Sequence, residues 1–103
     1  MYKLEFLPTA KKDIDDILYY VSNNLKNISA AKKLLNHFIK GANSILEFPF
    51  GLSIYNPIGN LKNEYRSVKV KKYLMFYTVD EKEKIITVVR VLHSKRNINN
   101  ILG

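Results

Sequence analysis

The fold is decided by residues 73–92, whose sequence is YLMFYTVDEKEKIITVVRVL. Residues 85–89 are β-branched throughout, which suits a central strand because branched side chains pack well on a pleated surface. Residues 80–83 are all charged and separate this stretch from the apolar residues 73–79. The pattern therefore predicts two strands, 73–79 and 84–92, joined by a charged hairpin turn.

The segments on either side of this hairpin extend the sheet and then become irregular. Residues 64–71 predict a third strand that enters the hairpin through a turn at 71–72. Residues 50–61 contain a proline and a glycine and predict an irregular loop. The polar tail, residues 97–103, contains the apolar residues Ile98, Ile101 and Leu102 and predicts a single helical turn.

The N-terminal half begins with a strand and continues with two helices. Residues 1–7 alternate apolar and polar side chains, which is strand periodicity. Thr9 is expected to cap a first helix whose apolar stripe runs from Ile14 to Leu25 at gaps of three and four. Ser29 is expected to cap a second helix, which ends before Pro49.

The predicted order of elements is β-α-α-β-β-β, which indicates an α+β fold. We expect one domain over residues 1–103, with an antiparallel sheet and a helical hairpin packed on one face. The other face of the sheet is then expected to be open, and it is the surface on which we expect the functional residues to lie.

The charge of the chain is positive and unevenly distributed. Residues 1–50 carry seven basic and five acidic side chains, a balance of +2, whereas residues 51–103 carry ten and four, a balance of +6. A basic half attracts polyanions or an acidic protein partner, although a lysine-rich surface can also serve only solubility. We expect no signal peptide and no membrane segment, and therefore a cytoplasmic protein.

The composition argues against metal and cofactor chemistry. The chain has no cysteine, and its two histidines lie 56 positions apart, so no metal-binding spacing is present. A glycine-rich phosphate loop is absent as well. We expect no metal and no cofactor, so a nuclease of this sequence would rely on a base, an acid and a guanidinium group.

Only three of the 17 basic residues are arginines, namely Arg66, Arg90 and Arg96, and all lie in the C-terminal half. A guanidinium group binds a phosphate or carboxylate through two parallel hydrogen bonds, which an ammonium group cannot do. These residues are therefore candidates for contact with an anionic target. The alternative is a structural ion pair of Glu64 with Arg66 or Arg90.

Further candidates lie on the strands around these arginines. His93 ends the last strand beside Lys95 and could act as a general acid or base, although a surface role is common for such a residue. Tyr73 and Tyr77 share a strand face, with Lys69 and Lys71 nearby. Interleaved aromatic and basic side chains can stack bases and hold phosphates, or form a groove for a partner's helix, or simply pack in a core.

Three segments of the C-terminal half resemble the RelE/ParE toxin superfamily: Glu64-Tyr65-Arg66, Tyr73-Leu74-Met75-Phe76-Tyr77 and Arg90-Val91-Leu92-His93-Ser94-Lys95-Arg96-Asn97. The segment at 10–17 resembles the opening helix of that family, so the likeness spans nearly the whole chain. It implies a toxin that arrests bacterial growth and is neutralised by a cognate antitoxin, acidic and DNA-binding. RelE-like members cut messenger RNA on the ribosome, and ParE-like members inhibit DNA gyrase.

Comparison with the family residue by residue favours the ParE-like side. Leu74 stands where nuclease members usually have an arginine, and Leu102 stands where they have a tyrosine. Under the nuclease alternative, Arg66 and Arg96 would bind the phosphate and His93 would be the acid or base. The other candidates would contact the target or the antitoxin: Glu64, Lys69, Lys71, Tyr73, Tyr77, Arg90 and Lys95. A basic RNA-binding or adaptor domain without toxicity is a further alternative.

Overall fold

The computed structural model describes residues 1–50, 65–96 and 101. Its elements in chain order are β1 (Lys3–Phe6), α1 (Pro8–Tyr19), a π-helical turn (Tyr20–Asn24), α2 (Ile28–Glu47), β2 (Arg66–Val70), β3 (Tyr73–Asp80) and β4 (Ile85–His93). The predicted α+β order is therefore confirmed. The predicted loop at 50–61 and the helical turn at 97–103 lie almost entirely outside the described residues.

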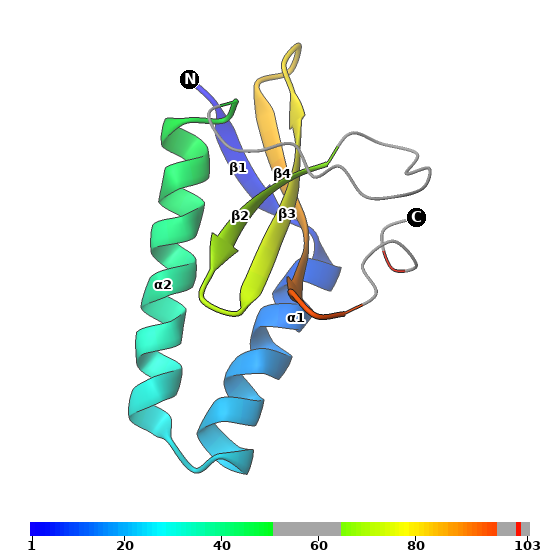
Figure 1. Cartoon of the computed structure of the whole chain (residues 1–103). Helices are drawn as coiled ribbons and strands as arrows, with labels where there is room; N and C mark the ends of the chain where they lie inside the picture. Colours follow the sequence, from blue (N-terminus) through cyan, green and yellow to red (C-terminus); the bar gives the residue numbers. More distant parts are fainter. Residues whose placement is uncertain (51–64, 97–100, 102–103) are drawn as a thin grey trace.

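The four strands form one sheet in the order β1-β4-β3-β2, with the helical hairpin packed against one face (Figure 1). The pairs β2–β3 and β3–β4 are antiparallel, as expected. β1 pairs with β4 in parallel, from Lys3 opposite Ile85 to Phe6 opposite Val88, so the sheet is mixed. A parallel neighbour needs a long crossover, and here the helical hairpin, β2 and β3 together supply it.

Both helices begin at residues other than those expected. Pro8 occupies the first turn of α1, where its fixed φ and missing N–H are tolerated, and the cap residue Leu7 makes no side-chain hydrogen bond. The hydroxyl of Thr9 instead donates to the carbonyl oxygen of Val89 at 3.0 Å. In α2 the cap is Asn27, whose side chain accepts from the N–H of Ala30, so Ser29 lies inside the helix.

The π-helical turn changes the end of the first helix. The N–H of Leu25 donates to the carbonyl oxygen of Tyr20, five residues earlier. This wider turn rotates the following side chains away from the core, because it advances fewer degrees per residue than an α-helix. The predicted apolar stripe therefore stops short, and Leu25 is 58% exposed.

The main core lies between the helical hairpin and the sheet. Its fully buried members include Ala10 of α1, Ile45 of α2 and Met75, Tyr77, Ile86 and Val88 of the sheet. Gly41 lets α2 approach β2, because a Cβ atom there would lie 2.8 Å from a methyl group of Val70. The position of the helical hairpin on the sheet therefore depends on this glycine.

The opposite face of the sheet is not as open as expected. Tyr65, Phe76 and Leu92 form a second buried cluster there, and Ile101 from the C-terminal tail packs against it. Phe76 is completely buried and Leu92 is 2% exposed. The second face is therefore an apolar surface that Ile101 partly covers.

Candidate functional site

The three arginines expected to bind an anion lie in different environments. The environment of Arg90 depends on a β-bulge in β4. The register jumps from Phe76 opposite Arg90 to Tyr77 opposite Val88, which leaves one extra residue in β4 as a bulge. Such bulges redirect side chains. Here the Arg90 side chain binds Asp13 of α1 through two hydrogen bonds, from Nε at 2.7 Å and from a terminal nitrogen at 3.0 Å.

Asp13 also accepts the backbone N–H of Val91 at 2.9 Å, in the part of β4 that β1 does not pair with. The hydrogen bond from Arg90 to this carboxylate raises the pKa of the guanidinium group, although partial burial opposes it. Arg90 therefore makes a structural ion pair, and its partner is Asp13. Glu64, the partner considered from the sequence, lies outside the described residues.

The two tyrosines expected to bind a partner have separate environments. Tyr77 is completely buried in the main core, where its hydroxyl donates to the carbonyl oxygen of Pro49 at 3.3 Å. The expectation that Tyr77 contacts a partner is therefore wrong, because a fully buried ring offers no surface. Tyr73 is half-buried and packs between Phe38, at 5.8 Å between ring centroids, and His93, at 5.5 Å.

His93 is held in one orientation by its own backbone. Its Nδ1 accepts the N–H of Lys95 at 3.1 Å, and its ring packs edge-on against Tyr73. Because Nδ1 is the acceptor, a neutral His93 carries its proton on Nε2 and presents a hydrogen-bond donor. For Nε2 to act as a general base, the ring would have to carry its proton on Nδ1 instead, and Nδ1 could then no longer accept the N–H of Lys95.

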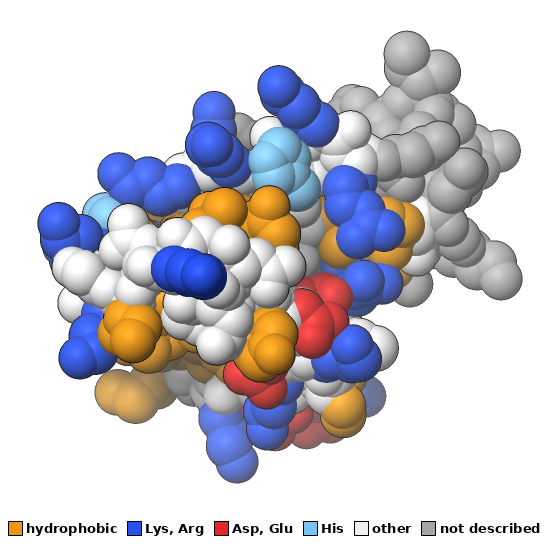
Figure 2. Space-filling model, turned by 90° about the horizontal axis from the view of Figure 1, so that it is seen from below, with side chains coloured by type: hydrophobic (Ala, Val, Ile, Leu, Met, Phe, Trp, Pro, Cys, Tyr) orange, Lys and Arg blue, Asp and Glu red, His pale blue; other side chains and the backbone are white. Residues whose placement is uncertain are grey.

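A pocket of about 350 Å³ lies beside His93, between the hairpin end of the helices and the turn from β2 to β3. We call it the His93 pocket, and its lining residues are Tyr20, Val21, Leu25, Ala30, Leu34, Lys71, Lys72, Tyr73 and His93. Figure 2, which views this end of the molecule, shows hydrophobic side chains below a histidine and Lys or Arg side chains around the same margin. The pocket brings together three predicted residues, Lys71, Tyr73 and His93.

The other residues of the His93 pocket were not predicted as functional. Tyr20 and Leu25 were assigned to the first helix, and the π-helical turn that places them at the pocket has no clear sequence signal. Lys72 was identified only as a turn residue. Lys72 lies near His93 because of a long-range backbone hydrogen bond, in which the N–H of Ser94 donates to the carbonyl oxygen of Lys72 at 2.9 Å.

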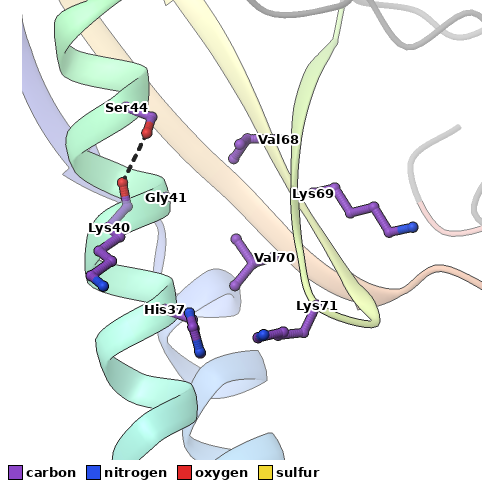
Figure 3. A pocket seen from close by; sticks show the side chains of 8 residues that line it. All are labelled: His37, Lys40, Gly41, Ser44, Val68, Lys69, Val70 and Lys71. Atoms are coloured by element: carbon purple, nitrogen blue, oxygen red, sulfur yellow. Dashed lines mark hydrogen bonds between the residues drawn. The ribbon is translucent and has the colours of Figure 1, made fainter.

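A second cleft, also about 350 Å³, separates α2 from the outer edge of β2 (Figure 3). The side chain of Lys71 extends towards His37, whereas that of Lys69 points away from α2 on the other side of β2. Partial burial lowers the pKa of His37, and the ammonium groups of Lys71 and Lys40 lower it further. The positive charge of the cleft therefore comes from its lysines, because His37 is neutral at neutral pH.

The three residues of the nuclease alternative do not converge. Arg66 pairs with Tyr77 and His93 pairs with Tyr73, so four residues of β3, or about 13 Å of strand, separate the two positions. The guanidinium group of Arg66 lies 5.0 Å from the ring centre of Phe50. Arg96 is exposed in the turn after β4, where its N–H donates to the carbonyl oxygen of His93 at 3.0 Å.

Among the described residues there is neither a metal-binding cluster nor a membrane-spanning helix. Within residues 1–50, 65–96 and 101, no three His, Cys, Asp or Glu side chains are grouped as a metal ion would require. In the same part of the chain, neither helix has the length and apolar character needed to span a bilayer.

Comparison with known families identifies the chain. The family model for the ParE toxin of the type II toxin–antitoxin system, parDE, matches residues 4–98. This chain belongs to the ParE toxin family. It is therefore a type II toxin of the RelE/ParE superfamily, as its resemblance to that superfamily implied. No curated protein matches the sequence.

Solved structures of toxins show the fold of the ParE family and its relatives. The chromosomal ParDE system of P. aeruginosa superposes with a TM-score of 0.70 at 17% identity, over 90% of this chain and 96% of that one. RelBE2 of Mycobacterium tuberculosis gives 0.64 at 17% identity, over 89% and 96%. The archaeal RelE–RelB complex of Pyrococcus horikoshii gives 0.64 at 14% identity, over 92% and 97%. At these identities the likeness establishes the fold alone.

Proposed function

We propose that this ParE-family toxin arrests growth by inhibiting DNA gyrase, and that a cognate acidic antitoxin neutralises it. The observation that carries the proposal is the separation of the nuclease candidates. Arg66 lies about 13 Å along the sheet from the position of His93. A phosphoryl-transfer site needs its acid, base and guanidinium group around one phosphorus atom.

The environment of Leu74 supports the same conclusion. Leu74 packs against the buried cluster of Tyr65, Phe76 and Leu92, and not towards a polar site. By resemblance, an arginine occupies this position in nuclease members of the superfamily. Here an apolar surface replaces that charge, so the face is better suited to a protein contact than to a phosphate.

The contact with gyrase is assigned to the basic region after β4. Lys95 and Arg96 are both exposed there, and neither has an acidic partner among the described residues. The purified protein is expected to block supercoiling of relaxed plasmid by gyrase. The double variant Lys95→Ala/Arg96→Ala should need at least about ten times more protein for the same inhibition. If the wild-type protein has no effect at saturating concentration, gyrase is not the target.

The antitoxin contact is assigned to the exposed face of α2. Four large aliphatic side chains on this helix are exposed although they are apolar: Ile28, Leu35, Ile39 and Leu46, at 64, 41, 50 and 37%. At 100° per residue all four fall within about 20° of one line along the helix. Lysines at 32, 33 and 40 follow on one side of this line. An amphipathic helix with acidic flanks complements such a surface.

Cleavage of messenger RNA is the second candidate, and one observation favours it. His93 and the exposed Arg96 share a single turn, in which the backbone N–H of Arg96 donates to the carbonyl oxygen of His93. If this is the active site, primer extension after induction should reveal new 5′ ends in messenger RNA. His93→Gln and Arg96→Ala should then each abolish those ends, whereas gyrase supercoiling should be unaffected by the wild-type protein.

A further inference from the structure

The His93 pocket has a composition that neither gyrase inhibition nor antitoxin binding explains. Its walls combine aliphatic side chains, Val21, Leu25 and Leu34, with the aromatic rings of Tyr20 and Tyr73. Cavities that bind small molecules are mostly apolar and carry a few polar groups that fix orientation. At about 350 Å³ the pocket has the size of such a site.

The pocket is supported on several sides, and its two lysines come from the exposed turn between β2 and β3. Tyr73 is wedged between Phe38 and His93, and the imidazole is fixed by the N–H of Lys95. The hydrogen bond from Ser94 to Lys72 holds the turn against the end of β4. The Tyr73 wall is therefore preorganised, so binding against it would cost little side-chain entropy, whereas Tyr20 is 51% exposed and would become ordered on binding.

The rim of the pocket carries positive charge without compensation. Lys71 and Lys72 are consecutive in the turn, and within the described part of the chain neither ammonium group forms an ion pair. Nε2–H of His93 adds a donor at the same margin. Figure 2 shows the cationic side chains along this margin, whereas the acidic ones gather on the other side of the exposed apolar atoms.

A ligand that combines a flat ring with a dianionic group matches both the aromatic walls and the basic rim of the pocket. A nucleobase can stack on aromatic side chains in the apolar part, while its phosphate meets two ammonium groups and the imidazole N–H. Base-paired DNA does not fit, because its bases are stacked inside the duplex and cannot enter a pocket.

We propose that the His93 pocket binds one nucleotide unit, with the base between Tyr20 and Tyr73 and the phosphate on Lys72 and on Lys71, which lines both this pocket and the neighbouring cleft beside His37. The unit can be a free nucleoside monophosphate or one nucleotide of a single strand. This site lies on the helical side of the sheet, on the face opposite to Leu74. Arg66 is on the same face but about 13 Å further along the strands. The site is independent of the proposed target, since a toxin acting on gyrase could carry it as well.

The test is an NMR titration of the ¹⁵N-labelled full chain with AMP, adenosine and inorganic phosphate as separate probes. AMP should shift the amide signals of residues 20–25, 71–73 and 93, and should bind at least about five-fold more tightly than adenosine or phosphate alone. Equal binding by adenosine, or shifts spread over the whole surface, would overturn the proposal. A six-nucleotide single-stranded RNA that shifts the same signals would identify a strand as a source, and binding of AMP alone would identify the free nucleotide.

Two variants and a matched control separate the pocket from general charge attraction. Lys72→Ala should weaken AMP binding at least about five-fold, and Ala30→Trp, which fills the pocket, should abolish it at an unchanged melting temperature. Lys82→Ala removes the same charge from the β3–β4 turn and should leave binding unchanged. If Lys82→Ala weakens binding as much as Lys72→Ala, or a hexaglutamate peptide displaces AMP at equal concentration, the pocket does not recognise a nucleotide.

Discussion

Asp13 links α1 to β4 through three hydrogen bonds, two from Arg90 and one from the N–H of Val91. Asp13→Ala leaves a partly buried guanidinium group and a backbone N–H without their acceptor. Hydrogen bonds to charged groups contribute about 1.5–3 kcal/mol each, but bonds to one carboxylate are not additive and this pair is partly exposed. We therefore expect a loss of about 2–3 kcal/mol in the free energy of unfolding. Urea denaturation followed by circular dichroism measures it.

A suitable control for this variant lies one turn further along α1. Asp16 forms an ion pair with Lys12 at 2.7 Å, but both side chains are mostly exposed, at 64 and 75%. Exposed pairs contribute little because water and salt screen them. Asp16→Ala should therefore leave the urea midpoint nearly unchanged, and equal losses for the two variants would contradict the structural role of Asp13.

Gly41 permits the close contact between α2 and β2. In Gly41→Ala the new Cβ atom would lie 2.8 Å from Val70 and 3.2 Å from the sulfur atom of Met75. Alanine favours the helix by about 1 kcal/mol, but overpacking of a tight contact costs about 1–3 kcal/mol. We expect a net decrease in the melting temperature. Ser44→Ala, one turn later and exposed, is the comparison, and a more stable Gly41→Ala would show that α2 can shift freely.

At the scale of single elements, α2 exposes a line of four large aliphatic side chains: Ile28, Leu35, Ile39 and Leu46. Such a line indicates a surface that a partner covers. Leu35→Ser combined with Ile39→Ser removes its centre without touching the core, since both side chains are at least 41% exposed. Affinity for the antitoxin should fall at least about ten-fold, measured by calorimetry, while the melting temperature stays the same. Leu7→Ser, an equally exposed residue outside α2, should bind normally; if it is as defective, the contact is elsewhere.

Element order could be predicted from the sequence because periodicity and turn residues are local signals. All six expected elements are present, and the charged turn at 80–83 joins β3 to β4 as predicted. The parallel pairing of β1 could not be predicted, because strand direction depends on the path of the helices between. The π-helical turn and the β4 bulge could not be predicted either. Each adds one residue to a hydrogen-bonded turn or strand, and no residue type in the sequence indicates where this happens.

The candidate site was only partly predictable for a related reason. Lys71, Tyr73 and His93 stood out as residue types near a strand end, and the structure places them on one pocket. The partner of Arg90 did not stand out, because Asp13 lies 77 positions away and looks like an ordinary first-helix acid. Tyr77 was misjudged because alternation along β3 does not tell which face of a sheet is covered.

At the scale of the whole molecule, the net charge of +8 and its concentration after residue 50 govern encounters with partners. A positive field of this kind accelerates association with an acidic protein, and salt screens it over about 10 Å at 0.1 M and about 3 Å at 1 M. Raising NaCl between these limits should slow antitoxin association at least about ten-fold in stopped-flow experiments. Dissociation should change much less, because it depends on the buried apolar contacts.

Charge reversal can show where this field originates. Lys95→Glu with Arg96→Glu should lower the association rate and flatten its salt dependence, because both cations are exposed in the basic half. Lys3→Glu with Lys11→Glu produces the same change in net charge at exposed positions in the N-terminal half. Since screening limits each charge to its surroundings, the second pair should have the smaller effect. Equal effects would mean that the antitoxin responds to total charge, and the region after β4 would then have no special part in its approach.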